Sequence, residues 1–258
     1  MGILVALIAT ALCAVVYVRM VKREIPEPIG KMQAAVPIGF GLLAVVLVVP
    51  MLALIGLLIK PLLSAIQGGA VSPVISSLIR SFFLAGFTEE FLKFLMFLIV
   101  LRIVKPKNVY EYGFLCAGIG VGFTFLEDIV YGAGTAAVWA RIFFFGMHIL
   151  FGLLMGTQLG LAKYSKQQGK GDAGKHLFLA FFLPILWHTV FDASTTTNAG
   201  LYSEDESAQI AGVVVALAVC AISIGLQIVL LIRFKKKTEE YCGMQLQTAS
   251  SPVSGDEA

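Results

Sequence analysis

The sequence predicts an all-α membrane protein, a polytopic bundle of about seven transmembrane helices. Of its 258 residues, 58% are hydrophobic and only 14% are charged, whereas soluble domains are about 45–50% apolar and about 25% charged. The apolar runs are continuous and long enough to cross a bilayer, which takes about 20 residues. The strands of a membrane β-barrel would instead alternate over segments of about ten residues. The basic residues gather in alternate loops, as they do in multi-pass membrane proteins.

Seven apolar runs are expected to span the membrane. They cover residues 2–18, 34–59, 76–104, 113–130, 142–162, 177–193 and 209–232. The stretch 61–75 is expected to form an outer loop or a short interfacial helix. All seven runs belong to a single polytopic membrane domain, residues 1–237, with a motif-bearing core at about 76–195. The polar tail, residues 238–258, has too little apolar surface to fold alone and is expected to be a disordered cytoplasmic tail.

The loop charges predict the orientation of the chain. Most of the 19 lysines and arginines follow the first, third, fifth and seventh runs, whereas the loop after the sixth run carries Glu204, Asp205 and Glu206 and no basic residue. The positive-inside rule therefore places the N-terminus outside and the C-terminus in the cytoplasm. Because the net charge of +3 comes mostly from these loops, it gives no reason to expect a nucleic-acid partner.

The third run contains three charged residues, Glu89, Glu90 and Lys93. A charged side chain at the centre of a bilayer costs at least about 2.5–3.5 kcal/mol. Lys93 lies four residues after Glu89 and three after Glu90, so a helix brings the three side chains together. They form either a buried ion pair that fixes the helix to its neighbours or a catalytic or transport carboxylate pair.

Three later runs also carry costly polar groups: Glu127 and Asp128, then His148, then His188 and Asp192. Each has a simpler explanation, since Asp128 could be wetted at the membrane edge, His148 could be a helix–helix hydrogen-bond donor, and His188 could pair with Asp192 within one helix. Their predicted depths nevertheless overlap with that of the glutamate pair. The sequence therefore predicts one shared, water-reachable cavity that opens outward.

Carboxylates and imidazoles around water suit hydrolysis, because a carboxylate can take a proton from water and an imidazole can stabilise the oxyanion. The same groups are ligands for zinc, whose catalytic sites keep a position for water. The sequence has no His-Glu-x-x-His motif, the commonest zinc-protease signature. It also places no serine or cysteine beside a histidine, which disfavours serine-type catalysis.

Glycines recur every four residues in the fourth and fifth runs, at Gly118 and Gly122 and at Gly152, Gly156 and Gly160. Small-residue stripes of this kind let membrane helices approach closely. We therefore expect these two runs to pack tightly against neighbours, and we interpret Gly118 to Gly122 as a packing surface rather than a nucleotide-binding loop.

Four ordered motifs resemble those of PrsW-type intramembrane proteases, in the CAAX prenyl protease and bacteriocin-processing superfamily. They are Glu89-Glu90-x-x-Lys93, Phe123-x-x-x-Glu127, the lone His148 and His188-x-x-x-Asp192. The resemblance covers about residues 81–192, and Asp128 departs from it, since asparagine is expected after the glutamate.

The resemblance implies a multi-pass peptidase embedded in a bacterial plasma membrane. It also implies that the enzyme makes the outer, site-1 cut in a membrane-bound anti-sigma factor. Its implied catalytic residues are Glu89, Glu90, Glu127, His188 and Asp192, with Lys93 and His148 in support. If the mechanism uses a metal, zinc is the candidate, with Glu90, Glu127, His148 and His188 as ligands. The implied partners are a transmembrane protein substrate and membrane lipid, with no soluble cofactor.

Two other classes of function compete with a protease. A proton-coupled transporter also uses buried carboxylates and histidines, but the sequence shows neither repeated halves nor paired broken helices. A non-catalytic scaffold of the same superfamily, an immunity or assembly factor, has no need of the complete motif set that this chain carries.

Overall fold

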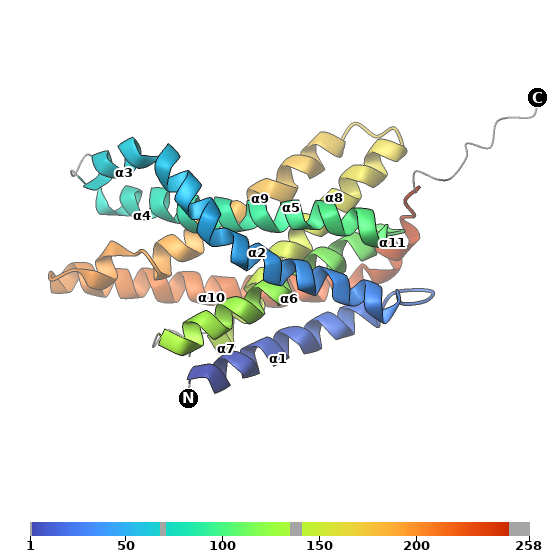
Figure 1. Ribbon diagram of the computed structural model, residues 1–258, viewed down its shortest axis with the longest axis horizontal. Helices are drawn as coiled ribbons and strands as arrows, with labels where there is room; N and C mark the ends of the chain where they lie inside the picture. Colours follow the sequence, from blue (N-terminus) through green and yellow to red (C-terminus); the bar gives the residue numbers. More distant parts are fainter. Residues whose placement is uncertain (1, 68–70, 135–140, 248–258) are drawn as a thin grey trace, which may run out of the picture.

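The computed structural model describes residues 2–67, 71–134 and 141–247, which form an elongated bundle of helices (Figure 1). The elements are α1 (Gly2–Val21), α2 (Lys31–Leu58), α3 (Lys60–Gln67), α4 (Pro73–Ser81), η1 (Phe82–Gly86), α5 (Phe87–Val104), α6 (Val109–Gly134), α7 (Arg141–Phe144), α8 (Met147–Gln167), α9 (Ala173–Thr195), η3 (Ala199–Tyr202), α10 (Glu206–Lys236) and α11 (Thr238–Gly243). These residues include no strand, so the predicted all-α fold is confirmed.

Helix α6 lies at the centre of the bundle, packed between α1, α2 and α8. Its glycines explain the close approach. An added Cβ at Gly122 would overlap the carbonyl oxygen of Ile38 on α2, and one at Gly120 would overlap that of His148 on α8. Gly152 on α8 meets α6 in the same way. The predicted packing role of the glycine stripes is confirmed, because side chains at these positions would force the helices apart.

The third predicted run is a continuous helical rod composed of α4, η1 and α5. It begins with Ser72 as N-cap, whose hydroxyl accepts from the Ile75 backbone N–H, and Pro73 follows in the first turn. The middle segment, η1, is a π-helix. Such wide turns inside α-helices are frequent at functional sites, and this one ends three residues before Glu89.

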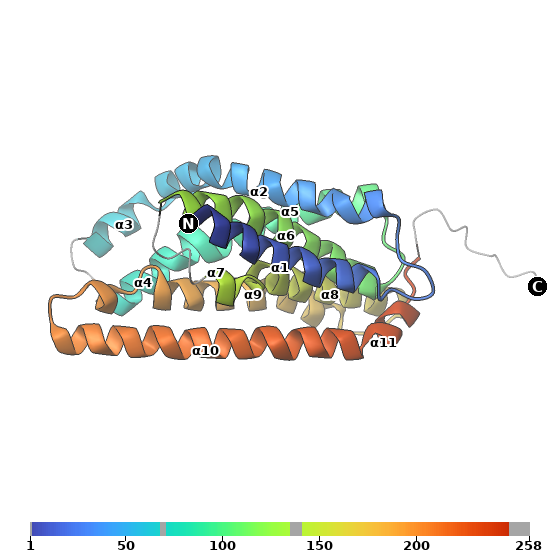
Figure 2. The same ribbon diagram turned by 90° about the horizontal axis from the view of Figure 1, so that it is seen from below.

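Five helices of the described chain are long and apolar enough to cross a membrane: α1, α2, α6, α9 and α10. Helix α5 carries Glu89, Glu90, Lys93 and Arg102, so its composition is too charged for it to be included among these candidate spans. Figure 2 shows α10 running along one side of the bundle and α2 along the opposite side. The number of seven spans and the orientation of the termini stay predictions.

The C-terminal segment differs from the expected disordered tail over its first ten residues. Residues Thr238–Gly243 form α11, and the backbone then returns to the start of α6, where Leu246 N–H donates to the Lys107 carbonyl at 2.6 Å. Thr238 and Cys242 are buried there. Burial of these side chains stabilises a segment whose composition alone predicted no fold. The rest of the expected tail, 248–258, lies outside the described residues.

Candidate active site

The structure brings together seven side chains that the sequence placed on four separate runs. They are Glu89, Glu90 and Lys93 on α5, Glu127 on α6, His148 on α8, and His188 and Asp192 on α9. Each contact joins residues that are either one helical turn or at least 21 residues apart in the chain. Residues that were predicted to lie at similar depths on four helices are thus in direct contact in the folded bundle.

Lys93 is the hub of this cluster. Its Nζ lies 2.8 Å from Glu90 Oε1, 3.4 Å from Glu89 Oε2 and 2.9 Å from His148 Nδ1. The ammonium also lies 3.9 Å from the centre of the Phe123 ring, a distance typical of a cation–π contact. Because an ammonium carries three donors and no acceptor, these contacts use the whole donor capacity of Lys93, and the one to His148 joins α5 to α8.

His188 links α9 to the same carboxylates. Its Nδ1 donates to Glu90 Oε1 at 3.0 Å, while its Nε2 lies 3.7 Å from Glu89 Oε2 and 3.8 Å from Asp192 Oδ2. His188 therefore does more than pair with Asp192 within one helix. The Nε2 distances to both carboxylates exceed hydrogen-bonding range, so this nitrogen has space for a third group between them.

Close packing fixes the position of His188. Gly86 at the end of η1 lies against α9, where an added Cβ would overlap the Thr189 hydroxyl and lie 2.9 Å from the Ile185 carbonyl. The ring of Phe151 on α8 stacks on the imidazole with centroids 5.1 Å apart. Phe151 was missed by the sequence analysis, since one more phenylalanine in an apolar run carries no signal of a neighbouring histidine.

Glu127 and His148 form the second half of the cluster. His148 Nε2 lies 2.6 Å from Glu127 Oε2. Since the Lys93 ammonium can only donate, His148 Nδ1 accepts from it and Nε2 donates to Glu127. Gly120 allows this geometry, because α8 crosses α6 there with the His148 carbonyl directly against the glycine. His148 thus bridges the lysine hub and the second carboxylate.

Exposure divides the cluster into two groups. The side chains of Glu89, Glu127 and Asp192 are 13%, 17% and 20% exposed. Those of Glu90 and Lys93 are 0% and 1% exposed. The first group therefore reaches the surface of the bundle, whereas the second is enclosed within it. Adjacent residues on a helix point about 100° apart, which explains why Glu89 and Glu90 fall into different groups.

Three of these residues fit a divalent metal ion. One ligand atom each from Glu89, Glu127 and His148 lies within 4.8 Å of the other two. Two carboxylates and an imidazole are a donor set that zinc accepts, and three protein ligands leave a position for water. The sequence predicted Glu90 and His188 as ligands besides Glu127 and His148. In the folded chain Glu90 Oε1 contacts Lys93 and His188 instead, and Glu89 completes the group.

Asp128 lies beside the cluster but faces another helix. Its side chain is fully buried, and its Oδ2 accepts a hydrogen bond from the Thr10 hydroxyl of α1 at 3.1 Å. The alternative of a wetted residue at the membrane edge is therefore wrong. A helix turns by about 100° per residue, so Asp128 points toward α1 while Glu127 points toward His148.

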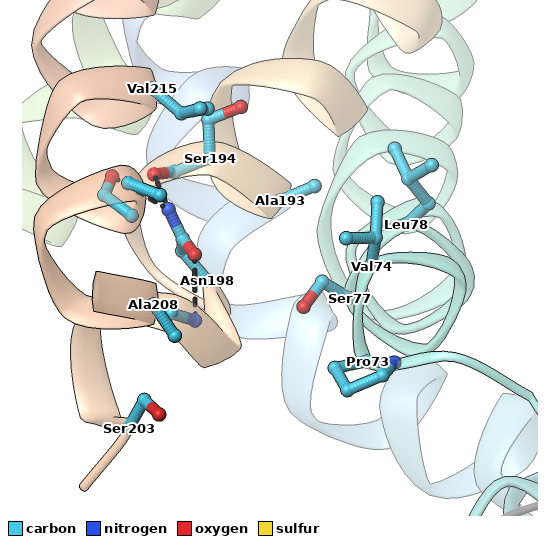
Figure 3. A pocket seen from close by; sticks show the side chains of 13 residues that line it. Pro73, Val74, Ser77, Leu78, Ala193, Ser194, Asn198, Ser203, Ala208 and Val215 are labelled. Carbon is cyan, nitrogen blue, oxygen red and sulfur yellow. Dashed lines mark hydrogen bonds between the residues drawn. The ribbon is translucent and has the colours of Figure 1, made fainter. Parts of the chain in front are cut away.

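A separate cavity of about 510 Å³ lies between α4, the end of α9, η3 and α10. Figure 3 shows Pro73, Val74 and Leu78 of α4 on one side of it, with Ala193 and Ser194 of α9 across the space. Its lining includes none of the seven cluster residues. Asn198, which donates to the Ser194 and Gly212 carbonyls, closes one wall. The cavity therefore belongs to the packing of α10 and not to the cluster.

The chain matches the model of the PrsW family of intramembrane metalloproteases over residues 27–223. Proteins named Protease PrsW from Halalkalibacterium halodurans and Oceanobacillus iheyensis are 31% and 32% identical to it over 121 residues, which is 45% of this chain and 54% of each relative. The Protease PrsW of Bacillus subtilis is 31% identical over 43% of this chain and 52% of its own. The chain spans about half the length of the curated relatives it matches. No solved structure matches it.

Proposed function

Because the chain belongs to the PrsW family of intramembrane metalloproteases and is a multi-pass membrane protein, we propose that it is an intramembrane endopeptidase that hydrolyses a peptide bond of a membrane-protein substrate. The observation that carries the proposal is the group of Glu89, Glu127 and His148 within 4.8 Å of one another. Three ionisable side chains from separate helices are costly in a membrane unless they serve a function.

In the proposed reaction Glu89 is the general base. Its carboxylate takes a proton from a water molecule while the water oxygen bonds to the carbonyl carbon of the scissile peptide, and the proton passes to the leaving nitrogen as the C–N bond breaks. Glu89 suits this role because its side chain is partly exposed and lies next to Lys93, which keeps it oriented. Glu90 is assigned a positioning role, since it is 0% exposed and contacts Lys93 and His188.

In the alternative that uses a metal, a zinc ion held by Glu89, Glu127 and His148 would supply a Lewis acid and lower the pKa of its water. Glu89 would then be a ligand rather than the free base. Lys93 and Glu127 contact the two nitrogens of His148 in the structure, so the nitrogen that binds zinc would have to give up its present partner. His188 holds Nε2 toward the space between Glu89 and Asp192. As an imidazolium, with a proton on each nitrogen, it can donate from Nε2 to the oxyanion that forms on the attacked carbonyl.

The proposed substrate is a single-span membrane protein cut near its extracytoplasmic side. Under the predicted topology, Glu89 and Glu90 lie near the middle of their span and the ionisable groups on the other three helices lie in the outer halves of theirs, which supports a cut toward the outer side. The finer proposal is site-1 cleavage of an anti-sigma factor, which rests on the resemblance of the four motifs. Product termini mapped to the cytoplasmic side would contradict the proposed depth.

The test measures cleavage by purified protein in liposomes. The substrate is a single-span membrane protein that accumulates at full length in cells without this protein. Wild type is compared with Glu89→Gln and with Glu206→Gln, an exposed glutamate at the start of α10. Positioned general bases contribute about 10²–10⁴-fold, so Glu89→Gln should lose at least about 100-fold in kcat while Glu206→Gln cleaves as wild type does.

A metal chelator and its non-chelating isomer separate the two parts of the proposal. Loss of cleavage with the chelator alone, restored by added zinc, supports the metal site. Cleavage that ignores the chelator but fails in Glu89→Gln overturns the metal and keeps the glutamate mechanism. Cleavage by Glu89→Gln at the wild-type rate would remove the basis of the proposed function.

A further inference from the structure

Helix α1 lies beside the site although it is outside the family match. The match begins at residue 27, whereas α1 covers Gly2–Val21 and packs along α6 and against α7. Both views show α1 running beside α6 (Figures 1 and 2). A helix that served only as a membrane anchor would have no reason to present polar side chains to the neighbourhood of the cluster.

The first polar contact is between Thr10 and Asp128. The Thr10 hydroxyl donates to Asp128 Oδ2 at 3.1 Å, and the Asp128 side chain is fully buried. Asp128 directly follows Glu127 on α6, so anchoring one residue constrains the backbone of the other. A buried carboxylate keeps its donors strongly, because each hydrogen bond to it compensates part of its desolvation. Thr10 therefore constrains the rotation of α6 at the position of Glu127.

The second polar contact is between Cys13 and Phe145. The Cys13 thiol contacts the Phe145 carbonyl oxygen, and Cys13 is completely buried. Phe145 lies three residues before His148, just ahead of α8, which begins at Met147. Phe145 precedes Gly146, the N-cap of α8, so its carbonyl lies outside the hydrogen-bond ladder of the helix. A group on α1 that contacts this carbonyl can therefore fix where α8 begins. Thr10 and Cys13 lie three apart and therefore share one face of α1.

Small residues make this face of α1 rigid. Ala6 and Ala9 are buried on it, and a Cβ added to Gly132 of α6 would lie 3.2 Å from the Ala6 Cβ. Close backbone contact of this kind leaves little freedom for one helix to slide on the other. The two polar contacts are thus held by a fixed helix rather than by a mobile one.

We propose that α1 is a positioning element of the catalytic cluster. Thr10 fixes the orientation of Glu127 through its hydrogen bond to the neighbouring Asp128, and Cys13 fixes the position of His148 through its contact at the start of α8. The geometry that depends on it is the 2.6 Å contact between His148 and Glu127. The inference rests on the proposed function, since it gives α1 a role in the same site. Its two residues act through neighbours and touch neither substrate nor metal.

The test compares three single variants and one double variant of the full chain in liposomes. Thr10→Val removes the hydroxyl at constant volume, Thr10→Ser keeps it, and Leu12→Val alters the exposed side of the same helix. The readouts are the zinc dissociation constant by competition with a chromophoric chelator, kcat and KM for cleavage, and the thermal midpoint. The zinc measurement needs no substrate.

Groups that orient metal ligands from outside typically change affinity or activity by about 10–100-fold. Thr10→Val should therefore weaken zinc binding and lower kcat by roughly tenfold or more with KM unchanged. Thr10→Ser should recover wild-type values, and Leu12→Val should equal wild type. Adding Cys13→Ala to Thr10→Val should deepen both losses, because it releases the second ligand-bearing segment.

Each outcome decides the inference. A Thr10→Val variant with wild-type kcat and zinc affinity overturns it, even when its thermal midpoint falls, because a merely structural contact would behave in this way. Equal losses in Thr10→Ser or Leu12→Val also overturn it. An active wild type with an inactive Glu89→Gln and an unaffected Thr10→Val refutes the role of α1 alone. A wild type that neither binds zinc nor cleaves overturns the proposed function and this inference together.

Discussion

Replacing Lys93 with methionine removes the charge at the centre of the cluster while keeping a side chain of similar length. Glu90, at 0% exposure, would lose the ammonium 2.8 Å away and retain His188 at 3.0 Å. Removing one partner of a buried ion pair costs about 3–5 kcal/mol, because the other charge stays buried without compensation. In a domain of this size, each kcal/mol moves the thermal midpoint by about 2–4 °C. We therefore expect Lys93→Met to lower it by roughly 6–20 °C.

The assay is thermal unfolding in detergent micelles, with two comparisons. Lys163→Met changes a half-buried lysine near the end of α8 that stands 5.6 Å from the Tyr112 ring, and it should shift the midpoint by a few degrees at most. The double variant Lys93→Met with Glu90→Gln should recover part of the loss, since neither charge then remains. A Lys93→Met midpoint within 2 °C of wild type, or a double variant less stable than the single one, would refute the reasoning.

Two further predictions concern packing and topology. Gly120→Ala should lower kcat and the thermal midpoint, because its Cβ would overlap the His148 carbonyl and such overpacking costs about 1–3 kcal/mol; Gly39→Ala, with open space around it, should change neither, and equal effects would count against the close crossing. The predicted orientation requires Glu204→Cys to react with an impermeant maleimide added outside intact cells and Gly171→Cys to react only after lysis; the reverse pattern would invert the topology.

The sequence alone determined the class of the protein and the membership of the cluster. Long apolar runs predict membrane helices because a helix that crosses the hydrocarbon core must be apolar over a length that matches its thickness. Charged residues inside such runs stand out because each is costly there, so Glu89, Lys93, Glu127 and His188 could be named as one candidate site. Glycine spacing predicted the close packing of α6 and α8 for an equally local reason.

The tertiary structure decided which neighbour compensates each charge. The free-energy cost of placing a glutamate in the membrane cannot separate Glu89 from Glu90, since the two are adjacent and chemically alike. Packing turns Glu90 toward Lys93 and His188 and leaves Glu89 with Glu127 and His148. The contact between Asp128 and Thr10 joins residues 118 positions apart, and no local pattern announces it.

The C-terminal segment shows the same limit. Its polar composition predicted disorder, yet residues 238–247 fold onto the start of α6, because burial against another part of the chain stabilises a segment that cannot fold alone. The local sequence fixes what each segment costs to place in a membrane or in water. Only the assembled bundle fixes the partners that offset the cost, since those partners come from distant helices whose rotation and register are set by packing.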